Sequence, residues 1–313
     1  MLLGPLLATD AMRAAREGAN GLDVESSMFP ELRDRTPEHE WILRNGKHWQ
    51  IASASFEDPV LTDTEEGNRG SCPVGMAEIR GHMKRDLSPY SLEAMQSIMC
   101  TDWMSRSFPE RCGVFDEGKW DAFIEGVPTS NVAFCIDRFE YPNVKGQYPW
   151  VLVTWIEATR LCGDEGKRLC SEDEWTFACE GEDAWPYPYG FIRSSATCVI
   201  DRPWRNYDDR AWADRAGRFA MLEIDRLWQG EASGSRPTCR SPFGVYDMTG
   251  NVDEWTQSVE TQGYRSVMKG GYWGEVRDRC RASTRAHGES FAFYQQGFRC
   301  CADVPASPQI QVK

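Results

Sequence analysis

The stretch GVYDMTGNVDEWT, residues 244–256, places two carboxylates on either side of a glycine and an asparagine. Asp247 and Glu254 supply hard oxygen atoms, and Gly250 and Asn251 allow a turn that aims backbone carbonyls inward. Proteins bind calcium through this combination of carboxylate and carbonyl oxygens. The spacing alone favours a simpler interpretation, in which both carboxylates are solvated on a hairpin, so a calcium site needs further support.

Short strand patterns occur before and after this stretch. The segments SCPVGMAEI (71–79), VAFCIDRFEYPN (132–143), SVMKGGYW (266–273) and GFRCCAD (297–303) are each typical of a strand. Helical spacing is found in SPYSLEAMQSIMCTDWM (88–104), where Pro89 suits a first turn. The pairs Thr154/Glu157 and Ser171/Glu174 fit capping boxes and predict two further helix starts. Most of the remaining chain after residue 180 is predicted to be loop.

The composition describes a globular, acidic chain. Its 313 residues are 41% hydrophobic and include 13 Trp, which is enough to fill a sizeable core. The formal net charge of −13 repels phosphate backbones and anionic lipid. No run of eighteen apolar residues exists that would predict a membrane span. Small molecules and proteins remain as partners, and we expect neither nucleic acid nor a membrane span.

The twelve cysteines indicate disulfides in an oxidising compartment. Their number is even, and no C-x-x-C motif suggests zinc. Buried reduced thiols remain an alternative. The predicted location is periplasmic or secreted, with a cytoplasmic location still open, and the pairing of the cysteines is not determined.

The first seventy residues are predicted to be an extension, 1–70, that does not fold alone. The main domain is expected to cover 71–303, followed by a tail at 304–313. The N-terminal apolar run lacks preceding basic residues and makes a poor signal peptide as it stands. It also fits the tail of a longer signal or an amphipathic helix capped by Thr9 or Asp10 and ended by Gly18.

The ordered motifs of the main domain resemble the formylglycine-generating enzyme, or sulfatase-modifying factor, family. The matching segments are FCIDRFEYPN (134–143), GKRLCSEDEWTFACEG (166–181), FGVYDMTGNVDEWT (243–256), MKGGYW (268–273), RASTR (281–285) and GFRC (297–300). The resemblance covers residues 72–303 and implies an α+β fold, an elaborated C-type-lectin-like domain with little regular secondary structure. Within it, Trp175 and Phe177 are expected in the core, and Arg168 is expected to bridge carboxylates. The stretch 81–129 is longer than the family's usual opening and is predicted to be a lid or a packing element.

The resemblance also raises the case for calcium. It implies a structural calcium ion held by Asp247, Gly250, Val252 and Glu254. Asp253 replaces a Trp that is common at this position and, on a strand, is expected to change packing and not the ion site. In a second ion-site segment of the family, RLWQGE (226–231), the Asn position is held by Arg226, a cation that cannot ligate calcium. We expect that second site to be absent.

The motif GGYWGEVRDRC (270–280) departs from the family in its cysteines. Members that make formylglycine carry two cysteines five residues apart after the glycine turn, and their thiolates bind copper(I). An ungapped count places Glu275 and Cys280 at these positions. Anchoring on RCRASTR places Arg281 and Arg285 in register and moves Cys280 to a non-catalytic position. In both alignments the two-thiol site is missing, so we expect no formylglycine generation from a sulfatase-type cysteine peptide.

Two other branches of the family can be compared with the chain. The sulfoxide-forming branch binds iron through three histidines, but His39, His48, His82 and His287 lack the H-x-x-x-H-x-E spacing. The periplasmic oxidase that matures pyoverdine lacks the cysteine pair, as this chain does, and acts on an aromatic chromophore. Of the branches compared, this one agrees best with the missing cysteine pair. No residue of the chain specifies an aromatic chromophore as the substrate.

These comparisons favour an oxidative enzyme of this family that acts on a peptide or small aromatic substrate without copper dithiolate chemistry. Its catalytic metal, where one is used, is not specified. The alternative is a non-catalytic, lectin-like module that binds a protein or small ligand. Glu275 is the preferred base or hydrogen-bond acceptor, although pairing with Arg277 or Arg279 would explain it equally. The full set of candidate residues is Glu275, Arg279, Cys280 and His287 for catalysis, and Tyr272, Trp273 and Arg285 for ligand binding.

Overall fold

The computed structural model describes residues 29–53, 71–87, 91–260 and 262–305. The helix expected in the first eighteen residues lies outside these ranges, as does Pro89. The chain divides into two compact units, one formed by Met1–Glu40 with Asn206–Leu227 and one formed by Trp41–Arg205 with Trp228–Lys313. They are referred to below as the small unit and the large unit.

The small unit is helical in its described part. It contains α2 (Pro30–Arg33), the 3₁₀ helix η1 (Asp209–Trp212) and α7 (Arg218–Leu227). Phe29 and Phe219 pack with ring centroids 5.1 Å apart. The buried carboxylate of Asp225 accepts hydrogen bonds from the backbone of Glu38 and His39 at 2.9 and 3.0 Å. These contacts hold the preceding chain against α7.

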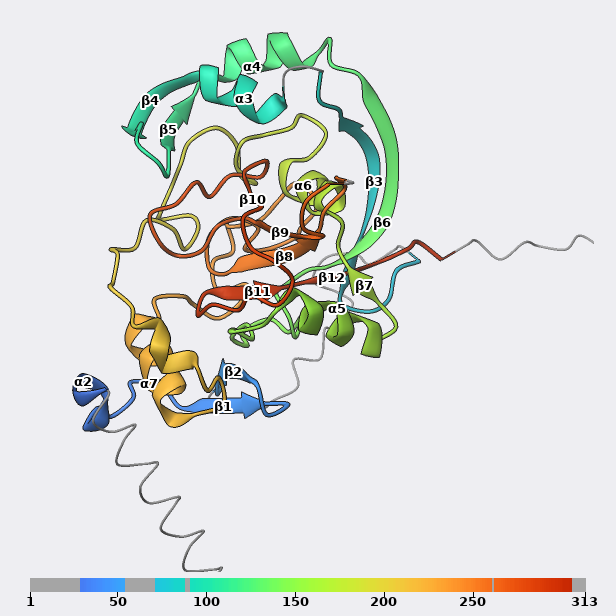
Figure 1. Ribbon diagram of the computed structural model, residues 1–313. Helices are drawn as coiled ribbons and strands as arrows, with labels where there is room; N and C mark the ends of the chain where they lie inside the picture. Colours follow the sequence, from blue (N-terminus) through green and yellow to red (C-terminus); the bar gives the residue numbers. More distant parts are fainter. Residues whose placement is uncertain (1–28, 54–70, 88–90, 261, 306–313) are drawn as a thin grey trace, which may run out of the picture. The chain divides into compact units, whose positions relative to one another are not determined.

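The large unit is a mixture of short strands, helices and long loops (Figure 1). Its helices are α3 (Leu92–Ile98), α4 (Glu117–Ile124), α5 (Trp155–Asp164) and α6 (Glu172–Glu180). Its strands are β1 (Trp41–Arg44), β2 (His48–Ile51), β3 (Met76–Lys84), β4 (Cys100–Ser105), β5 (Arg111–Phe115), β6 (Thr129–Asp137), β7 (Arg168–Leu169), β8 (Asp253–Gln257), β9 (Ser266–Lys269), β10 (Ser283–Thr284), β11 (Gln296–Phe298) and β12 (Cys300–Ala302). The expectation of an α+β fold with little regular secondary structure is confirmed.

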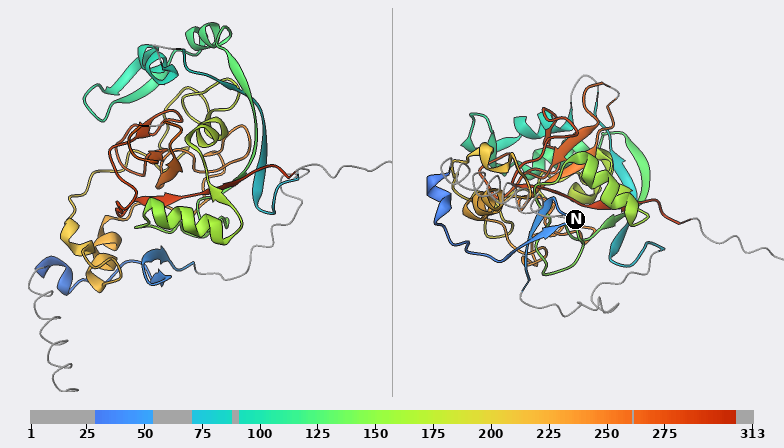
Figure 2. Two further views of the ribbon diagram at one scale, coloured as in Figure 1. Left: turned by 45° about the vertical axis from the view of Figure 1, so that its right-hand side comes forward. Right: turned by 60° about the horizontal axis from the view of Figure 1, so that its bottom comes forward.

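Two four-stranded sheets organise the large unit. One has the order β3-β6-β12-β7, and the other has the order β10-β9-β8-β11 with β11 parallel to β8. The strands β3 and β6 form a long antiparallel pair from Met76↔Asp137 to Lys84↔Thr129. Figure 2 shows from two further directions that α3, α4 and the β4–β5 hairpin lie near one end of this pair. The hydrophobic core formed by α6 and the sheet β3-β6-β12-β7 contains fully buried Trp175 and Phe177, as expected.

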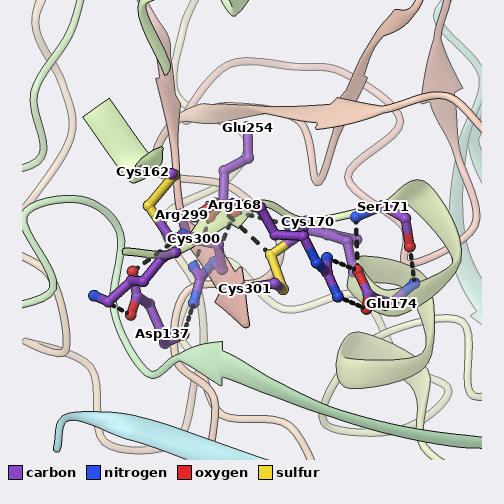
Figure 3. The surroundings of a disulfide bond; sticks show 12 residues. Asp137, Cys162, Arg168, Cys170, Ser171, Glu174, Glu254, Arg299, Cys300 and Cys301 are labelled. Carbon is purple, nitrogen blue, oxygen red and sulfur yellow. Dashed lines mark hydrogen bonds and ion pairs between the residues drawn. A yellow bond between two sulfur atoms is a disulfide. The ribbon is translucent and has the colours of Figure 1, made fainter. Parts of the chain in front are cut away.

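Local sequence signals explain where α5 and α6 begin. Thr154 and Ser171 each accept a hydrogen bond from the backbone of the glutamate three residues later, and that glutamate bonds back to the cap residue. Both predicted capping boxes are therefore confirmed. Arg168 pairs with Glu174 at 2.6 Å (Figure 3). It also pairs with Asp303 at 2.7 Å, which confirms its expected bridging role.

The predicted helix over 88–104 is only partly correct. The helix α3 covers Leu92–Ile98, with Ser91 as its N-cap, and the chain from Cys100 onward forms β4. A disulfide between Cys100 and Cys112 ties β4 to β5. With α4, these elements form a hydrophobic cluster against Tyr187 and Phe191. The elements α3, β4, β5 and α4 thus pack as a group against the loop that carries these two residues.

All twelve cysteines form disulfides, as the cysteine count predicted. The pairs are Cys72–Cys135, Cys100–Cys112, Cys162–Cys300, Cys170–Cys301, Cys179–Cys280 and Cys198–Cys239. The neighbouring Cys300 and Cys301 fix β12 to α5 and to the residue after β7 (Figure 3). Six disulfides indicate an oxidising compartment. None of the described helices has the length and apolar character needed to cross a bilayer.

Candidate functional site

The turn after β9 depends on two glycines with left-handed backbone angles. Gly270 and Gly271 have φ values of 87° and 74°. A Cβ atom on Gly271 would lie 2.1 Å from Oδ1 of Asp278, and one on Gly270 would lie 2.9 Å from the carbonyl oxygen of Met248. Larger residues at either position would collide with their surroundings and strain the backbone. These glycines therefore allow the chain to pass tightly along the wall of a cavity.

The cavity at this turn has a volume of about 410 Å³. Its wall combines exposed aromatic side chains, Phe108 and Trp204, with Tyr272 and the apolar side chains of Met268, Val276 and Ala282. The polar part of the wall is formed by Asp253, Glu275, Arg277 and Asp278. Sites that bind small molecules have this character, in which an apolar lining carries a few charged groups. The segment 81–129, predicted to be a lid or a packing element, contributes Phe108 and Pro109.

Glu275 lies on this cavity wall, as the sequence analysis expected. Its side chain is 47% exposed and pairs with Arg111 at 3.2 Å. The expected pairing with Arg277 or Arg279 is not what the structure shows, because both of those arginines contact Glu93 instead. Glu275 is therefore a polar group of the cavity that is partly open to solvent and whose cationic partner comes from β5.

Cys280 has a structural role, which corrects its assignment as a catalytic residue. Its sulfur is bonded to Cys179 of α6, and its side chain is fully buried. A cysteine in a disulfide offers no thiolate for catalysis or copper binding. This position agrees with the alignment anchored on RCRASTR, in which Cys280 is non-catalytic.

Tyr272 and Trp273 have different surroundings. Tyr272 lines the cavity, and its ligand-binding role stays a prediction. Trp273 is 1% exposed and packs in the interior, with its ring centroid 4.7 Å from that of Trp228 and 5.9 Å from that of Tyr294. The structure therefore corrects the expectation that both rings present a free face to a ligand.

Three other candidates do not line the cavity, so their predicted roles there need correction. Arg279 is buried beneath α3, where its guanidinium approaches Ser97 and Glu93 at 3.3 and 3.4 Å. Arg285 pairs with Glu172 and Glu260 and lines a separate polar cavity of about 460 Å³. His287 stacks on Phe291 with centroids 4.0 Å apart, and partial burial lowers the pKa of its imidazole.

Asp253 and Asp278 are cavity residues that the functional prediction missed. Burial raises the pKa of Asp253 to about 7, and it raises the pKa of Asp278 well above its ordinary value. Asp278 pairs with the buried Arg193, which also binds Asp201 at 2.8 Å. The sequence shows Asp253 where a Trp is common in the family, and from this we predicted a change in packing but no role in a cavity. Asp278 carried no comparable signal.

The predicted calcium ligands lie among buried carboxylates. Asp247 and Glu254 are almost fully buried, and Glu140 lies close enough to both for their charges to raise its pKa, in addition to the effect of burial. Burial likewise raises the pKa of Asp247 to about 7. Both carboxylate oxygens of Glu254 accept hydrogen bonds from the guanidinium of Arg299, at 2.6 and 2.7 Å (Figure 3). Glu254 also accepts a hydrogen bond from the indole N–H of Trp175.

The chemistry of this cluster fits a divalent cation. Three buried carboxylates, Glu140, Asp247 and Glu254, face one guanidinium, that of Arg299, and such an excess of buried negative charge is costly without a further cation. Within the described ranges, no three His, Cys, Asp or Glu side chains converge as a metal site on their own. A calcium ion would therefore need the backbone carbonyls of Gly250 and Val252 as well.

The segment that resembles the second ion site is split between the two units. Arg226 is near the end of α7 in the small unit and pairs with Glu223 at 2.6 Å. Gln229 belongs to the large unit, where its amide donates to the carbonyl of Pro203 at 3.0 Å. Arg226 is therefore engaged in a salt bridge of its own helix, and the expected absence of a second calcium site stays a prediction.

Comparison with known proteins identifies relatives with the same ordered motifs. The family model for the sulfatase-modifying factor enzyme 1-like domain matches residues 113–304. The inactive C-alpha-formylglycine-generating enzyme 2 of Bos taurus is 28% identical over 174 residues, which are 52% of this chain and 53% of that protein. The formylglycine-generating enzyme of Mycobacterium tuberculosis is 27% identical over 153 residues, which are 48% of this chain and 46% of that protein. The chain thus spans about half the length of the curated relatives it matches.

Solved structures give a weaker match. CarF aligns with 13% identity and a TM-score of 0.46, covering 74% of this chain and 99% of the other. PvdO from Pseudomonas aeruginosa aligns with 16% identity and a TM-score of 0.40, covering 86% of this chain and 99% of the other. The assignment rests on the family model, which matches well over half of the chain. The chain belongs to the sulfatase-modifying factor family and has its α+β, C-type-lectin-like fold.

Proposed function

We propose that this family member binds a peptide or small aromatic ligand in the cavity beside Gly270 and Gly271, without copper dithiolate chemistry. The observation that carries the proposal is the combination of a cavity at the glycine turn with the absence of any free thiol. Copper(I) binding of the dithiolate kind requires at least two thiolates in fixed geometry. Cys280, the one cysteine near this turn, is bonded to Cys179.

The size and lining of the cavity support a ligand with an aromatic part. A volume of about 410 Å³ lies within the range of small-molecule sites. Phe108, Trp204 and Tyr272 offer aromatic surface, and aromatic rings pack favourably in offset or edge-to-face arrangements. Glu275 and Arg277 add polar groups for hydrogen bonds to a peptide or to a substituted ring.

Oxidation of the bound ligand is the second candidate function. It is supported by relatives named formylglycine-generating enzyme in Mus musculus and Mycobacterium tuberculosis. Such a reaction would need an oxidant and a cofactor other than a copper dithiolate. The relatives named as inactive forms support the purely binding function instead.

We also propose a structural calcium ion and an extracytoplasmic location. Asp247 and Glu254 would hold the ion with the carbonyls of Gly250 and Val252, and the excess of buried carboxylates supports this assignment. When bound, the ion would neutralise charge and fix the turn between β8 and the preceding loop. The six disulfides support a periplasmic or secreted protein.

Ligand binding can be tested with neutral aromatic probes. Saturation-transfer NMR with N-acetylphenylalanine amide and N-acetyltyrosine amide should detect binding to the purified protein. Trp204→Ala removes aromatic surface from the cavity and should reduce the signal at least fivefold. Tyr264→Ala is the matched control, because Tyr264 is similarly exposed but does not line the cavity. Absence of binding, or equal losses in both variants, would contradict the proposed function.

A further inference from the structure

The charges around the cavity do not balance. Glu275 pairs with Arg111 at 3.2 Å, and Arg111 also pairs with Asp201 at 3.1 Å. Asp201 binds the buried Arg193, which in turn binds Asp278. This connected network contains three carboxyl groups, Asp201, Glu275 and Asp278, but two guanidinium groups. One carboxyl group is therefore left without a guanidinium of its own, and burial raises the pKa of Asp278 well above its ordinary value.

Asp278 has an oxygen without a hydrogen-bond partner. The side chain is fully buried and lines the cavity, and Oδ1 accepts no hydrogen bond from any described residue, whereas Oδ2 binds Arg193. An unpaired, buried carboxylate oxygen is unfavourable, since its lost hydration is not replaced. The side of the cavity beside Gly271, where this oxygen lies, is thus short of hydrogen-bond donors and of positive charge.

Asp253 adds a second carboxylate to the same wall. Burial raises its pKa, while the backbone of Gly271 and the charge of Arg277 act in the opposite direction. In the described part of the chain, no basic side chain comes within salt-bridge distance of it. Arg277, the basic residue on the cavity wall, is held by Glu93 at 3.2 Å and by the carbonyl of Ser283 at 2.7 Å. Asp253 and Asp278 interact electrostatically with each other and with Tyr272.

From these contacts we propose that the cavity selects ligands in which a primary ammonium group is carried on an aromatic body. The ammonium group would lie beside Asp253, within the field of Asp278, and the aromatic body would contact Trp204 and Phe108. This inference rests on the proposed function, because it assigns the chemical class of ligand for the same cavity.

The available oxygens favour ammonium over guanidinium. Asp278 uses Oδ2 for Arg193, so it does not present a free pair of oxygens, which the planar guanidinium group uses for bidentate binding. An ammonium group is a compact charge with three donors and can bind single oxygens.

The test compares a cation with a neutral molecule of the same shape. The affinities of 2-phenylethylammonium and 2-phenylethanol are measured by titration NMR on the full chain at about pH 8, where the amine is largely protonated. The ammonium probe should bind at least tenfold more tightly than the alcohol. Asp253→Asn should remove this preference while leaving the affinity for the alcohol within about twofold.

Asp121→Asn is the matched control, because Asp121 is exposed on α4 and does not line the cavity. This variant should keep the full preference for the ammonium probe. Equal affinity for both probes, or an unchanged preference in Asp253→Asn, would overturn the inference and leave the proposed function standing. Failure of both probes to bind would overturn the proposed function as well. Folding of each variant is verified by its amide NMR spectrum, and Asp253→Glu, which retains the charge, should restore part of the preference.

Discussion

Cys280 is joined to Cys179 by a disulfide that ties the loop after the cavity wall to helix α6. The two Cα atoms are 5.5 Å apart, and both side chains are fully buried. In the family members that make formylglycine, cysteines after the glycine turn are expected to bind copper. Here the cysteine of this region stabilises the fold, and the neighbouring wall is left with carboxylates and aromatic rings.

Removal of this disulfide should destabilise the protein strongly. The Cys179→Ala/Cys280→Ala variant loses a cross-link between residues 101 apart in sequence, and loss of such a bond typically costs about 2–5 kcal/mol. Cys100→Ala/Cys112→Ala, whose residues are 12 apart, should cost less because the loop it closes is short. Guanidinium denaturation measures both values. A smaller loss for the long-range pair than for the short-range pair would contradict the prediction.

Loss of Arg193 should be more damaging than loss of an exposed arginine. Arg193→Met leaves Asp278 and Asp201 without their shared buried cation, and such uncompensated charges cost about 3–5 kcal/mol. Arg210→Met, which breaks an exposed pair with Asp208, should destabilise the protein much less, because solvent and salt screen such a pair. Adding Asp278→Asn to Arg193→Met should recover part of the lost stability. If the double variant recovers no stability, the uncompensated charge of Asp278 is not the cause of the loss in Arg193→Met.

Calcium should stabilise the native protein through Asp247 and Glu254. A ligand that binds only the folded state stabilises it by RT ln(1 + [L]/Kd) and so raises the melting temperature. Calcium added to chelator-treated protein should therefore raise Tm by several degrees, and Glu254→Gln should abolish this rise. Glu125→Gln, at an exposed residue after α4, is the control and should keep it. An unchanged Tm on calcium addition to the wild-type protein would remove the proposed site.

Asp137 should make a pH-dependent contribution to stability. Burial raises its pKa to about 6, despite the nearby Lys167, compared with about 3.9 in an unfolded chain. The native state therefore binds the proton more tightly, so this contribution is complete below about pH 4 and is lost as the pH rises through 6. The loss amounts to about 2–3 kcal/mol.

Asp137→Asn cannot ionise and tests this contribution directly. The unfolding free energy of the wild-type protein, minus that of Asp137→Asn, should fall between about pH 4 and pH 7. The same difference measured with Asp121→Asn should stay nearly constant. Urea denaturation across this pH range measures both differences, and a difference for Asp137→Asn that rises with pH would mean that the sign is wrong.

The sequence predicted those parts of the fold that depend on local chemistry. The capping boxes at Thr154 and Ser171 located α5 and α6, because a hydroxyl and a glutamate three residues apart satisfy the same backbone groups. The helix predicted over 88–104 was too long, because pairing of β4 with β5 and the Cys100–Cys112 disulfide outweighed the helical spacing. Such long-range pairings leave little trace in a single sequence.

Only the cavity residues in and just after the glycine turn were predictable from the sequence. Gly270, Gly271, Tyr272 and Glu275 follow each other along the chain and were recognised together. Phe108 and Trp204 come from distant segments that have no motif, and Asp278 gains its importance only from burial beside Arg193. Trp273, Arg279 and His287 lie near the glycine turn in sequence, but their side chains pack elsewhere.

The central claim is that this family member works without copper dithiolate chemistry, and a conversion assay tests it most directly. Purified, disulfide-intact protein is supplied with copper(I) and a sulfatase-type cysteine peptide, and formylglycine is measured by mass spectrometry with an active family enzyme as the positive control. The account predicts no formylglycine above the level found without protein, because Cys280 is bonded to Cys179. Sustained conversion that is lost in Cys280→Ala would contradict it.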